Sequence, residues 1–128
     1  MKLKDLLIDY CSIKKSDFNN LKNLNFSGVY ILCCGDDVVY VGSAYARTIE
    51  TRLKQYLSTT DTGNSLMRAI YKMDNKDNSF SNASDDDKKA IVDKIKKFKI
   101  YAIKHEDLEY KLIEKANPKY NHKGNNEP

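Results

Sequence analysis

The sequence lacks any apolar run long enough to span a bilayer or to serve as a signal peptide. Its 128 residues, 41% hydrophobic and 31% charged, are typical of one soluble globular domain, so we expect a cytoplasmic protein without a membrane partner. Cysteine is scarce: there are three, and Cys33 and Cys34 are adjacent in a predicted strand, where neighbouring side chains point to opposite faces. We therefore expect reduced structural thiols rather than a cysteine metal site or a catalytic cysteine.

Positive charge exceeds negative charge only mildly, with 22 lysines and arginines against 18 aspartates and glutamates and a net charge of +4. This excess favours an anionic partner without identifying one, because many basic proteins of this size bind nothing anionic. The lysines are clustered, and a solvated helix face explains the clusters as well as phosphate contact does. They are Lys2, Lys4, Lys14, Lys15 and Lys22, and then Lys88, Lys89, Lys94, Lys96, Lys97 and Lys99.

The apolar pattern predicts an α+β fold with a small three-stranded antiparallel sheet flanked by helices. We expect a helical N-terminal extension over residues 1–24, a domain over 25–123 and a polar tail over 124–128. The expected elements are a β-hairpin within 28–42, helices at 47–58, from 64 or 65 onward, at 85–98 and at 106–116, a strand at 99–104, and a polar loop at 74–85. Asn64 or Ser65 is the expected N-cap of the second of these helices.

The predicted hairpin carries two tyrosines. Its strands are the apolar, β-branched runs 28–34 and 38–42, and the Gly-Asp-Asp segment 35–37 between them has the composition of a short hairpin loop. If Cys34 faces Val38 across this loop, then Tyr30 faces Gly42. Tyr40 then faces Leu32 and lies on the same face as Tyr30, diagonal to it and roughly 7–8 Å away at Cα. Gly42 has no side chain and so leaves space over Tyr30.

Two interpretations of these tyrosines remain open on the hairpin alone. Tyrosine is a good strand residue, so Tyr30 and Tyr40 are explained by sheet packing. They are also explained as two phenols held side by side for chemistry.

Arg52 and Tyr56 are four residues apart on the helix predicted after the hairpin, so they stack on one face at the rim of the core. This pair is suited to a bound phosphate, although a solvated Arg-Tyr stack explains the spacing as well.

Glu109 is the least expected residue of the last predicted helix. It lies in register with Leu112, Ile113 and Ala116, so a carboxylate shares the apolar stripe of that helix. A carboxylate facing the core side must be paired, protonated or metal-bound, because desolvating it alone is costly. A salt bridge, for instance to Arg52, and a site for a hard cation such as Mg²⁺ both satisfy this requirement.

Together these segments resemble the GIY-YIG nuclease family. Gly28-Val29-Tyr30 stands for the first family triplet and Tyr40-Val41-Gly42 for the second, each with Val in place of Ile. The stretch from Glu109 through an apolar pair to Asn117-Pro118 and Asn121 is similar to the family's C-terminal pattern. The resemblance spans residues 28–121.

The resemblance implies a divalent-metal-dependent endonuclease that hydrolyses DNA, with Mg²⁺ or Mn²⁺ and no organic cofactor. Tyr30 would orient and deprotonate water, Arg52 would clamp the phosphate and Glu109 would be the single protein ligand of the ion. Tyr40 and Tyr56 would be hydrogen-bonding supports and Asn121 a positioning residue. The substrate would be contacted by Gly42, Ser43, Arg47, Lys54 and Arg68.

One departure concerns Ser43, because some members carry a lysine after the second triplet. Lys54 or Arg47 would then have to substitute, or the rate would be lower. Two other classes of protein remain open as alternatives. One is a binding module that keeps the fold without cutting nucleic acid. The other is an interaction protein that responds neither to Mg²⁺ nor to DNA.

Overall fold

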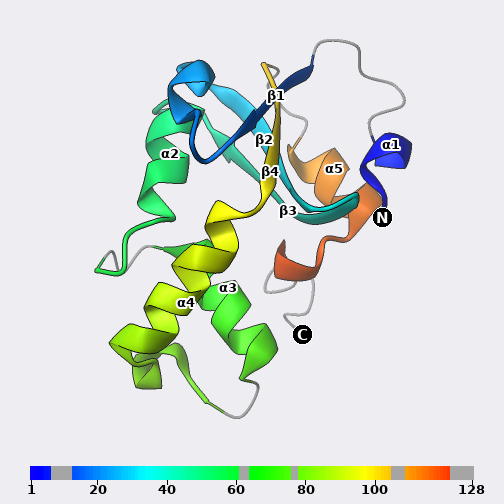
Figure 1. The fold of residues 1–128 in the computed structure, drawn as a ribbon. Coiled ribbons are helices and arrows are strands. Elements are labelled where there is room, and N and C mark those ends of the chain that lie inside the picture. The colour runs from blue at the N-terminus through cyan, green and yellow to red at the C-terminus, as the bar shows by residue number, and fades with distance from the viewer. Residues whose placement is uncertain (7–12, 61–63, 76–77, 105–108, 122–128) are drawn as a thin grey trace.

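The structure is a computed structural model that describes residues 1–6, 13–60, 64–75, 78–104 and 109–121. Its centre is an antiparallel sheet of four strands, β1 (Ile13–Asp17), β2 (Gly28–Cys34), β3 (Asp37–Ala44) and β4 (Lys99–Ile103). Their order across the sheet is β1-β4-β2-β3 (Figure 1). The α+β class is confirmed, whereas the expected count of three strands is wrong because the sheet has four.

The additional strand, β1, lies where the sequence predicts a helical extension. β1 pairs with β4 along its length, from Ile13 opposite Ile103 to Asp17 opposite Lys99. Its one buried side chain is that of Ser16. Apolar alternation is the signal by which a strand is found in a sequence, and this edge strand has none. The extension also contains a short helix and a 3₁₀ turn at residues 21–24, while Leu7 and Tyr10 lie outside the described residues.

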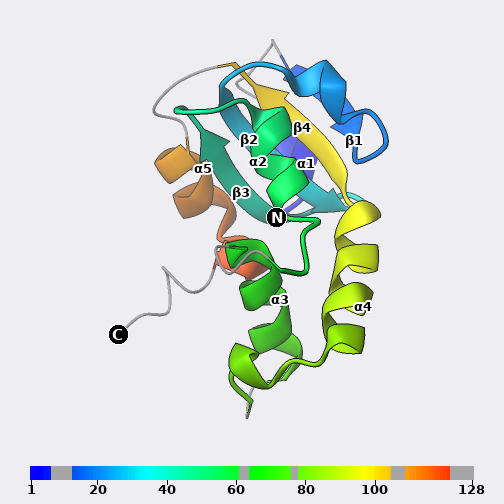
Figure 2. The same cartoon turned by 90° about the vertical axis from the view of Figure 1, so that its left-hand side faces the viewer.

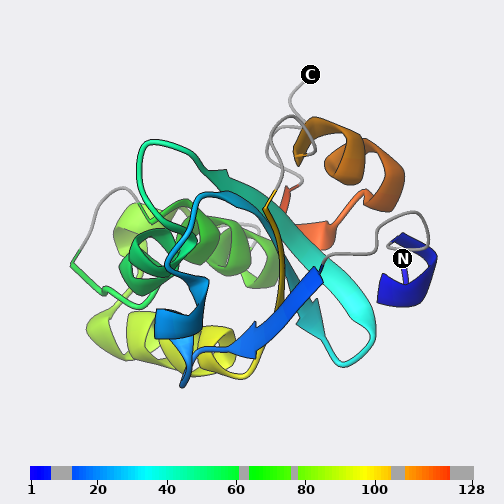
Figure 3. The same ribbon diagram turned by 90° about the horizontal axis from the view of Figure 1, so that it is seen from above.

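Helices cover both faces of the sheet (Figure 3). On one side lie α2 (Ile49–Gln55), α3 (Ser65–Asp74) and α4 (Asp85–Lys96), and α3 and α4 extend beyond one end of the sheet (Figure 2). The other side carries α1 (Leu3–Leu6) and α5 (Glu109–Ala116). Each side buries its own apolar cluster against alternate residues of β2. Within the described residues, no helix has the length and apolar character needed to cross a bilayer.

The hairpin register is confirmed around the tyrosines and wrong at the turn. Tyr30 pairs with Gly42 and Leu32 with Tyr40. Nearer the turn the pairing shifts by one residue, so that Cys34 faces Asp37 rather than Val38. The turn is therefore two residues long and begins at Gly35, whose φ of 61° suits glycine in the first position of such a turn. A β-bulge absorbs the extra residue, and the sequence carries no signal for it.

Most expected helices form with small changes in their bounds. α2 is shorter than the predicted 47–58, because Thr48 caps its start and the helical pattern stops after Gln55. α3 begins at Ser65 with Asn64 as its N-cap, as predicted. α4 begins as predicted, with a capping box between Ser84 and Asp87. The expected loop 74–85 includes a 3₁₀ turn, η2 (Phe80–Asn82).

The adjacent cysteines point to opposite faces, as predicted: Cys33 is buried and Cys34 is exposed. Burial raises the pKa of the Cys33 thiol to about 12, so at neutral pH it stays protonated and unreactive. Cys11 lies outside the described residues.

The first residues of the chain brace β3 and α5. The N–H of Val38 donates to the carbonyl of Met1 at 2.9 Å, and the N–H of Leu3 donates to the carbonyl of Asp36 at 2.8 Å. Leu6 is 0% exposed and belongs to the same buried cluster as Leu112 of α5. Residues 1–6 thus pack against the sheet beside α5.

Leu6→Ala should lower the free energy of unfolding by about 2–5 kcal/mol, because it leaves a cavity beneath α5. Urea denaturation measures this difference. Lys4→Ala is the matched control, since Lys4 is exposed on the same helix. A Leu6→Ala protein as stable as the control would show that this packing contributes nothing.

Candidate active site

Three phenols meet on the side of the sheet covered by α2. Tyr30 comes from β2, Tyr40 from β3, and Tyr56 caps the C-terminus of α2. Their ring centroids are 6.0 to 6.4 Å apart. The hydroxyl of Tyr56 is 2.5 Å from that of Tyr30 and 3.4 Å from that of Tyr40, so it links the other two. Tyr30 and Tyr56 are 1% and 0% exposed.

Gly42 makes this arrangement possible. A Cβ built on Gly42 would collide with Cζ and the hydroxyl of Tyr30, which faces it across the hairpin. The space predicted over Tyr30 is therefore the space in which its own ring lies. Any larger residue at position 42 would displace that ring.

Tyr30 and Tyr40 are neutral in the free protein. Burial is the main cause that raises the pKa of Tyr30 well above its ordinary value, and the neighbouring Tyr56 adds to it. The pKa of Tyr40 is raised for the same two reasons. Arg52 opposes both shifts but is a smaller influence. A phenol here gives up its proton only when further positive charge arrives.

Arg52 joins the tyrosine cluster as predicted from its spacing. Its guanidinium carbon lies 4.9 Å from the ring centroid of Tyr56, in a cation–π contact. Nη1 of Arg52 also donates to Oε1 of Gln55 at 3.2 Å. Burial opposes the charge of Arg52, but Tyr56 and Tyr30 outweigh it and raise its pKa. The side chain is half-buried and remains a cation.

Two supporting residues were missed as parts of the site. Gln55 accepts hydrogen bonds from Arg52 and, at 2.8 Å, from Arg47, and its place three residues after Arg52 was the available signal. Asn64 was identified from the sequence as an N-cap alone. It is 1% exposed, and its amide donates to the carbonyl of Tyr56 at 3.0 Å, so it ties α3 to the residue that centres the cluster.

Glu109 accepts a hydrogen bond from the hydroxyl of Ser43, with Oγ and Oε1 2.7 Å apart. No ion pair joins Glu109 to Arg52 in the part of the chain that the structure describes, so the predicted salt-bridge alternative is not formed. Ser43, which departs from the family pattern, thus fixes the carboxylate. Glu109 is half-buried at the first position of α5.

Asn121 clamps the edge of β3. Its Oδ1 accepts from the N–H of Val41 and its Nδ2 donates to the carbonyl of the same residue, both at 2.8 Å. It lies at the end of η3 (Lys119–Asn121), a 3₁₀ turn that packs beside β3. The amide therefore takes the place of a neighbouring strand, and its contact is with the scaffold.

The expected site residues lie on two sides of β3. Ser43 pairs with Val29, one position along from Gly42, so its side chain points to the face opposite Tyr30. Glu109 thus lies on the α5 side and the phenols lie on the α2 side. β3 is an edge strand, so no further strand separates the two sides at this edge, where Asn121 binds Val41.

The basic residues expected to contact substrate are more dispersed. Lys54 forms an ion pair with Glu50, with Nζ and Oε2 3.0 Å apart. Arg47 lies near Arg52 through their shared partner Gln55. The guanidinium carbon of Arg68 lies 4.9 Å from the ring centroid of Phe80, so this side chain contacts η2.

The donors at Glu109 suit a hard divalent cation. A carboxylate oxygen and a hydroxyl oxygen lie together, and Mg²⁺ prefers one or two carboxylates completed by water and phosphate oxygens. No cluster of three or more His, Cys, Asp or Glu side chains occurs within the described ranges. A cation held here would take one carboxylate from these residues and would need water or phosphate oxygens to complete its coordination.

The comparisons with known proteins agree with the resemblance seen in the sequence. A family model described as the GIY-YIG catalytic domain matches residues 26–121. Searches of curated proteins and of solved structures gave no match. The matched segment contains the phenols, Arg52, Glu109 and Asn121 and covers most of the chain. The chain therefore belongs to the GIY-YIG family, whose members are nucleases.

Proposed function

We propose that the protein is a DNA endonuclease that hydrolyses phosphodiester bonds with Mg²⁺ or Mn²⁺. The observation that carries the proposal is that four of the six expected site residues lie on, or contact, one stretch of β3, residues 40–43. Tyr40 is itself one of the six expected residues. Asn121 binds Val41, Tyr30 lies against Gly42, and Glu109 accepts from Ser43. The remaining two, Tyr56 and Arg52, join through the phenol cluster.

In this proposal the phenol cluster handles the attacking water. Tyr30 orients the water and accepts its proton, and the Tyr56 hydroxyl holds Tyr30 in place. Because burial raises the pKa of Tyr30, the phenol needs nearby positive charge before it can act as a base. Arg52, stacked on Tyr56, supplies part of that charge.

The other groups act on the phosphate. The planar guanidinium of Arg52 grips two phosphate oxygens and stabilises the charge that grows in the transition state. Glu109, fixed by Ser43, holds the divalent ion, which when bound would neutralise charge on the phosphate and stabilise the leaving oxygen. Asn121 holds β3 in position relative to Arg52 and Glu109.

Glu109→Gln should lower the cleavage rate by at least about 100-fold while leaving fold and DNA affinity intact, because an amide is a poor ligand for a hard cation. The assay is digestion of plasmid, nicked and branched DNA with and without Mg²⁺. Glu114→Gln is the matched control, since Glu114 is exposed on the same helix. Full activity in Glu109→Gln would overturn the ligand role. DNA binding without cutting by the unmodified protein would favour the non-cleaving module.

Arg52→Lys should reduce kcat/KM by about 10²–10³-fold, the loss typical of removing one donor that stabilises transition-state charge. Lysine keeps the charge but loses the planar fork and much of the contact with Tyr56. Steady-state kinetics measure the loss, and circular dichroism checks the fold. Equal rates for lysine and arginine would mean that position 52 supplies only a positive field.

Tyr30→Phe should slow cleavage by about 10²–10⁴-fold with little change in stability, because it removes one hydroxyl and almost no volume. In the unmodified protein the rate should rise with pH between 7 and 9, since the raised pKa leaves little phenolate to act. The variant should lose that rise.

Tyr40→Phe is the comparison for this test, because it removes a hydroxyl from the same cluster. A slower cleavage rate in Tyr40→Phe, together with a normal rate in Tyr30→Phe, would mean that Tyr40 accepts the proton and Tyr30 is the hydrogen-bonding support. Normal cutting by both variants would return the tyrosines to sheet packing.

A further inference from the structure

Two arginines meet on one uncharged oxygen beside the phenol cluster. Nη1 of Arg47 and Nη1 of Arg52 donate to the same atom, Oε1 of Gln55, at 2.8 and 3.2 Å. The two nitrogens are therefore separated by at most the combined length of these two hydrogen bonds. Like charges this close repel each other, and an amide oxygen carries only a partial negative charge to offset the repulsion.

The charges of this pair are not neutralised by a carboxylate. Among the residues that the structure describes, no aspartate or glutamate forms an ion pair with Arg47 or Arg52. Glu50 lies on the same helix, but its carboxylate is paired with Lys54. Arg47 is exposed and Arg52 is half-buried, so a ligand can reach both from solvent. Two adjacent cations without a counter-ion favour the binding of an anion.

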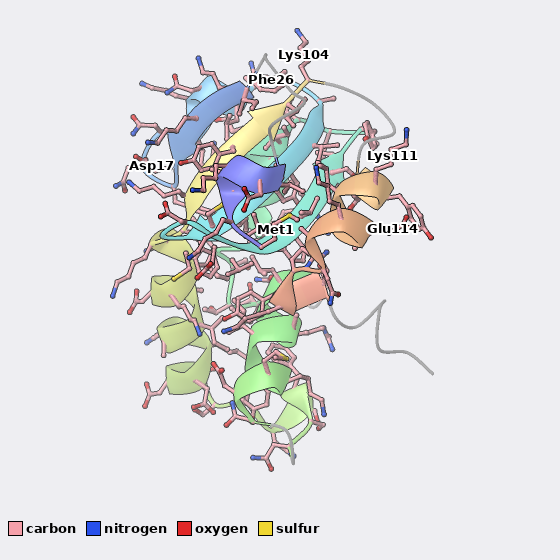
Figure 4. All side chains as sticks on the ribbon, turned by 90° about the vertical axis from the view of Figure 1, so that its right-hand side faces the viewer. Met1, Asp17, Phe26, Lys104, Lys111 and Glu114 are labelled. Atoms are coloured by element: carbon pink, nitrogen blue, oxygen red, sulfur yellow. The ribbon has the colours of Figure 1, made fainter. Side chains whose placement is uncertain are left out.

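The backbone that carries Arg47 is anchored to the segment before β2. Oγ of Ser27 donates to the carbonyl of Arg47 at 3.1 Å. The carbonyl of Phe26 accepts from the N–H of Ile49, the first residue of α2, at 2.9 Å. Phe26 lies at the end of the molecule that Lys104 marks in Figure 4. The backbone of Arg47 is therefore held in place before any ligand binds.

The backbone of Gln55 is anchored at the other end of α2. Nδ2 of Asn64 donates to the carbonyls of Gln55 and Tyr56, at 3.4 and 3.0 Å. Arg52, between the two ends of the helix, stacks on the ring of Tyr56. A site whose parts are already in place loses less conformational entropy when its ligand binds. The three polar side chains thus form a preorganised group.

We infer that Arg47, Arg52 and Gln55 form a second phosphate site, which binds the phosphate next to the scissile one in the same DNA strand. This inference rests on the proposed nuclease function, in which Arg52 grips the scissile phosphate. An arginine has five N–H donors, so Arg52 can serve two neighbouring phosphates while Arg47 supplies the second charge. The short separation of the two guanidinium groups fits phosphates of one strand, which recur about every 3.4 Å along the duplex axis.

In this site the amide oxygen of Gln55 holds the place of a phosphate oxygen. When DNA binds, a phosphate oxygen replaces Oε1 of Gln55 between the two guanidinium groups. Its negative charge relieves their repulsion, and hydrogen bonds between ionised groups are stronger than those to an amide. Gln55 is thus a positioning residue, which orients both arginines without neutralising them.

The test measures DNA affinity at several salt concentrations by fluorescence anisotropy, in Glu109→Gln protein so that the DNA is not cut. Arg47→Gln should raise Kd by about 10-fold, and it should reduce the steepness of log Kd against log salt by about 0.9, the share of one phosphate contact. Lys22→Gln is the matched control, since it removes the same charge from η1 (Leu21–Leu24), which packs against α2. Equal effects of the two changes would overturn the phosphate site.

Gln55→Glu tests the place-holding role. A carboxylate at position 55 would pair with both guanidinium groups and compete with phosphate, so Kd should rise at least as much as in Arg47→Gln. Urea denaturation should show no loss in the free energy of unfolding, so the weaker binding would not come from a damaged fold. An unchanged Kd in Gln55→Glu would overturn the site.

Cleavage kinetics separate this inference from the nuclease proposal. Arg47→Gln should raise KM and leave kcat nearly unchanged, because a contact to a phosphate that does not react is equally strong in the ground state and the transition state. Loss of affinity in Arg47→Gln, without cleavage by the unmodified protein, would keep the phosphate site and overturn the nuclease. Cleavage by the unmodified protein, with unchanged KM and salt dependence in Arg47→Gln, would overturn the phosphate site and keep the nuclease.

Discussion

The close approach of Tyr30 to Gly42 is the contact on which the candidate site depends. The ring of Tyr30 fills the position that a side chain on residue 42 would take. From there its hydroxyl reaches Tyr56, which in turn contacts Arg52 and Tyr40. A slip of one residue between β2 and β3 would turn Tyr30 to the other face of the sheet and dissolve the cluster. The geometry of the phenols therefore depends on the register of the hairpin.

β3 is an edge strand, and both ends of the described chain protect its outer edge. An edge exposes unpaired backbone groups that invite pairing with another molecule. Met1 accepts from the N–H of Val38, and Asn121 satisfies both backbone groups of Val41. Asn121 has been interpreted as a residue of the active site, yet its contacts are with the backbone. These contacts make Asn121 a residue that holds the edge strand in place.

The sequence predicts best what depends on local pattern. The pairing of Tyr30 with Gly42 and the N-cap at Asn64 follow from strand alternation and capping chemistry, and both are confirmed. β1 is missed because an edge strand with one buried side chain has no apolar alternation. The bulge near the turn has no signature in residue type. The bond between Ser43 and Glu109 joins positions far apart in the chain, so helical spacing identifies the buried carboxylate but not its partner.

The charges of the site explain why a cation and a substrate would bind together under the proposed function. Tyr30 and Tyr40 are neutral because burial raises their pKa, so they add no charge at neutral pH. Arg52 on one side of β3 attracts a phosphodiester, whereas Glu109 on the other side repels it. A divalent ion at Glu109 would reverse that repulsion, and the phosphate oxygens would in turn complete the coordination of the ion. Each ligand therefore strengthens the binding of the other.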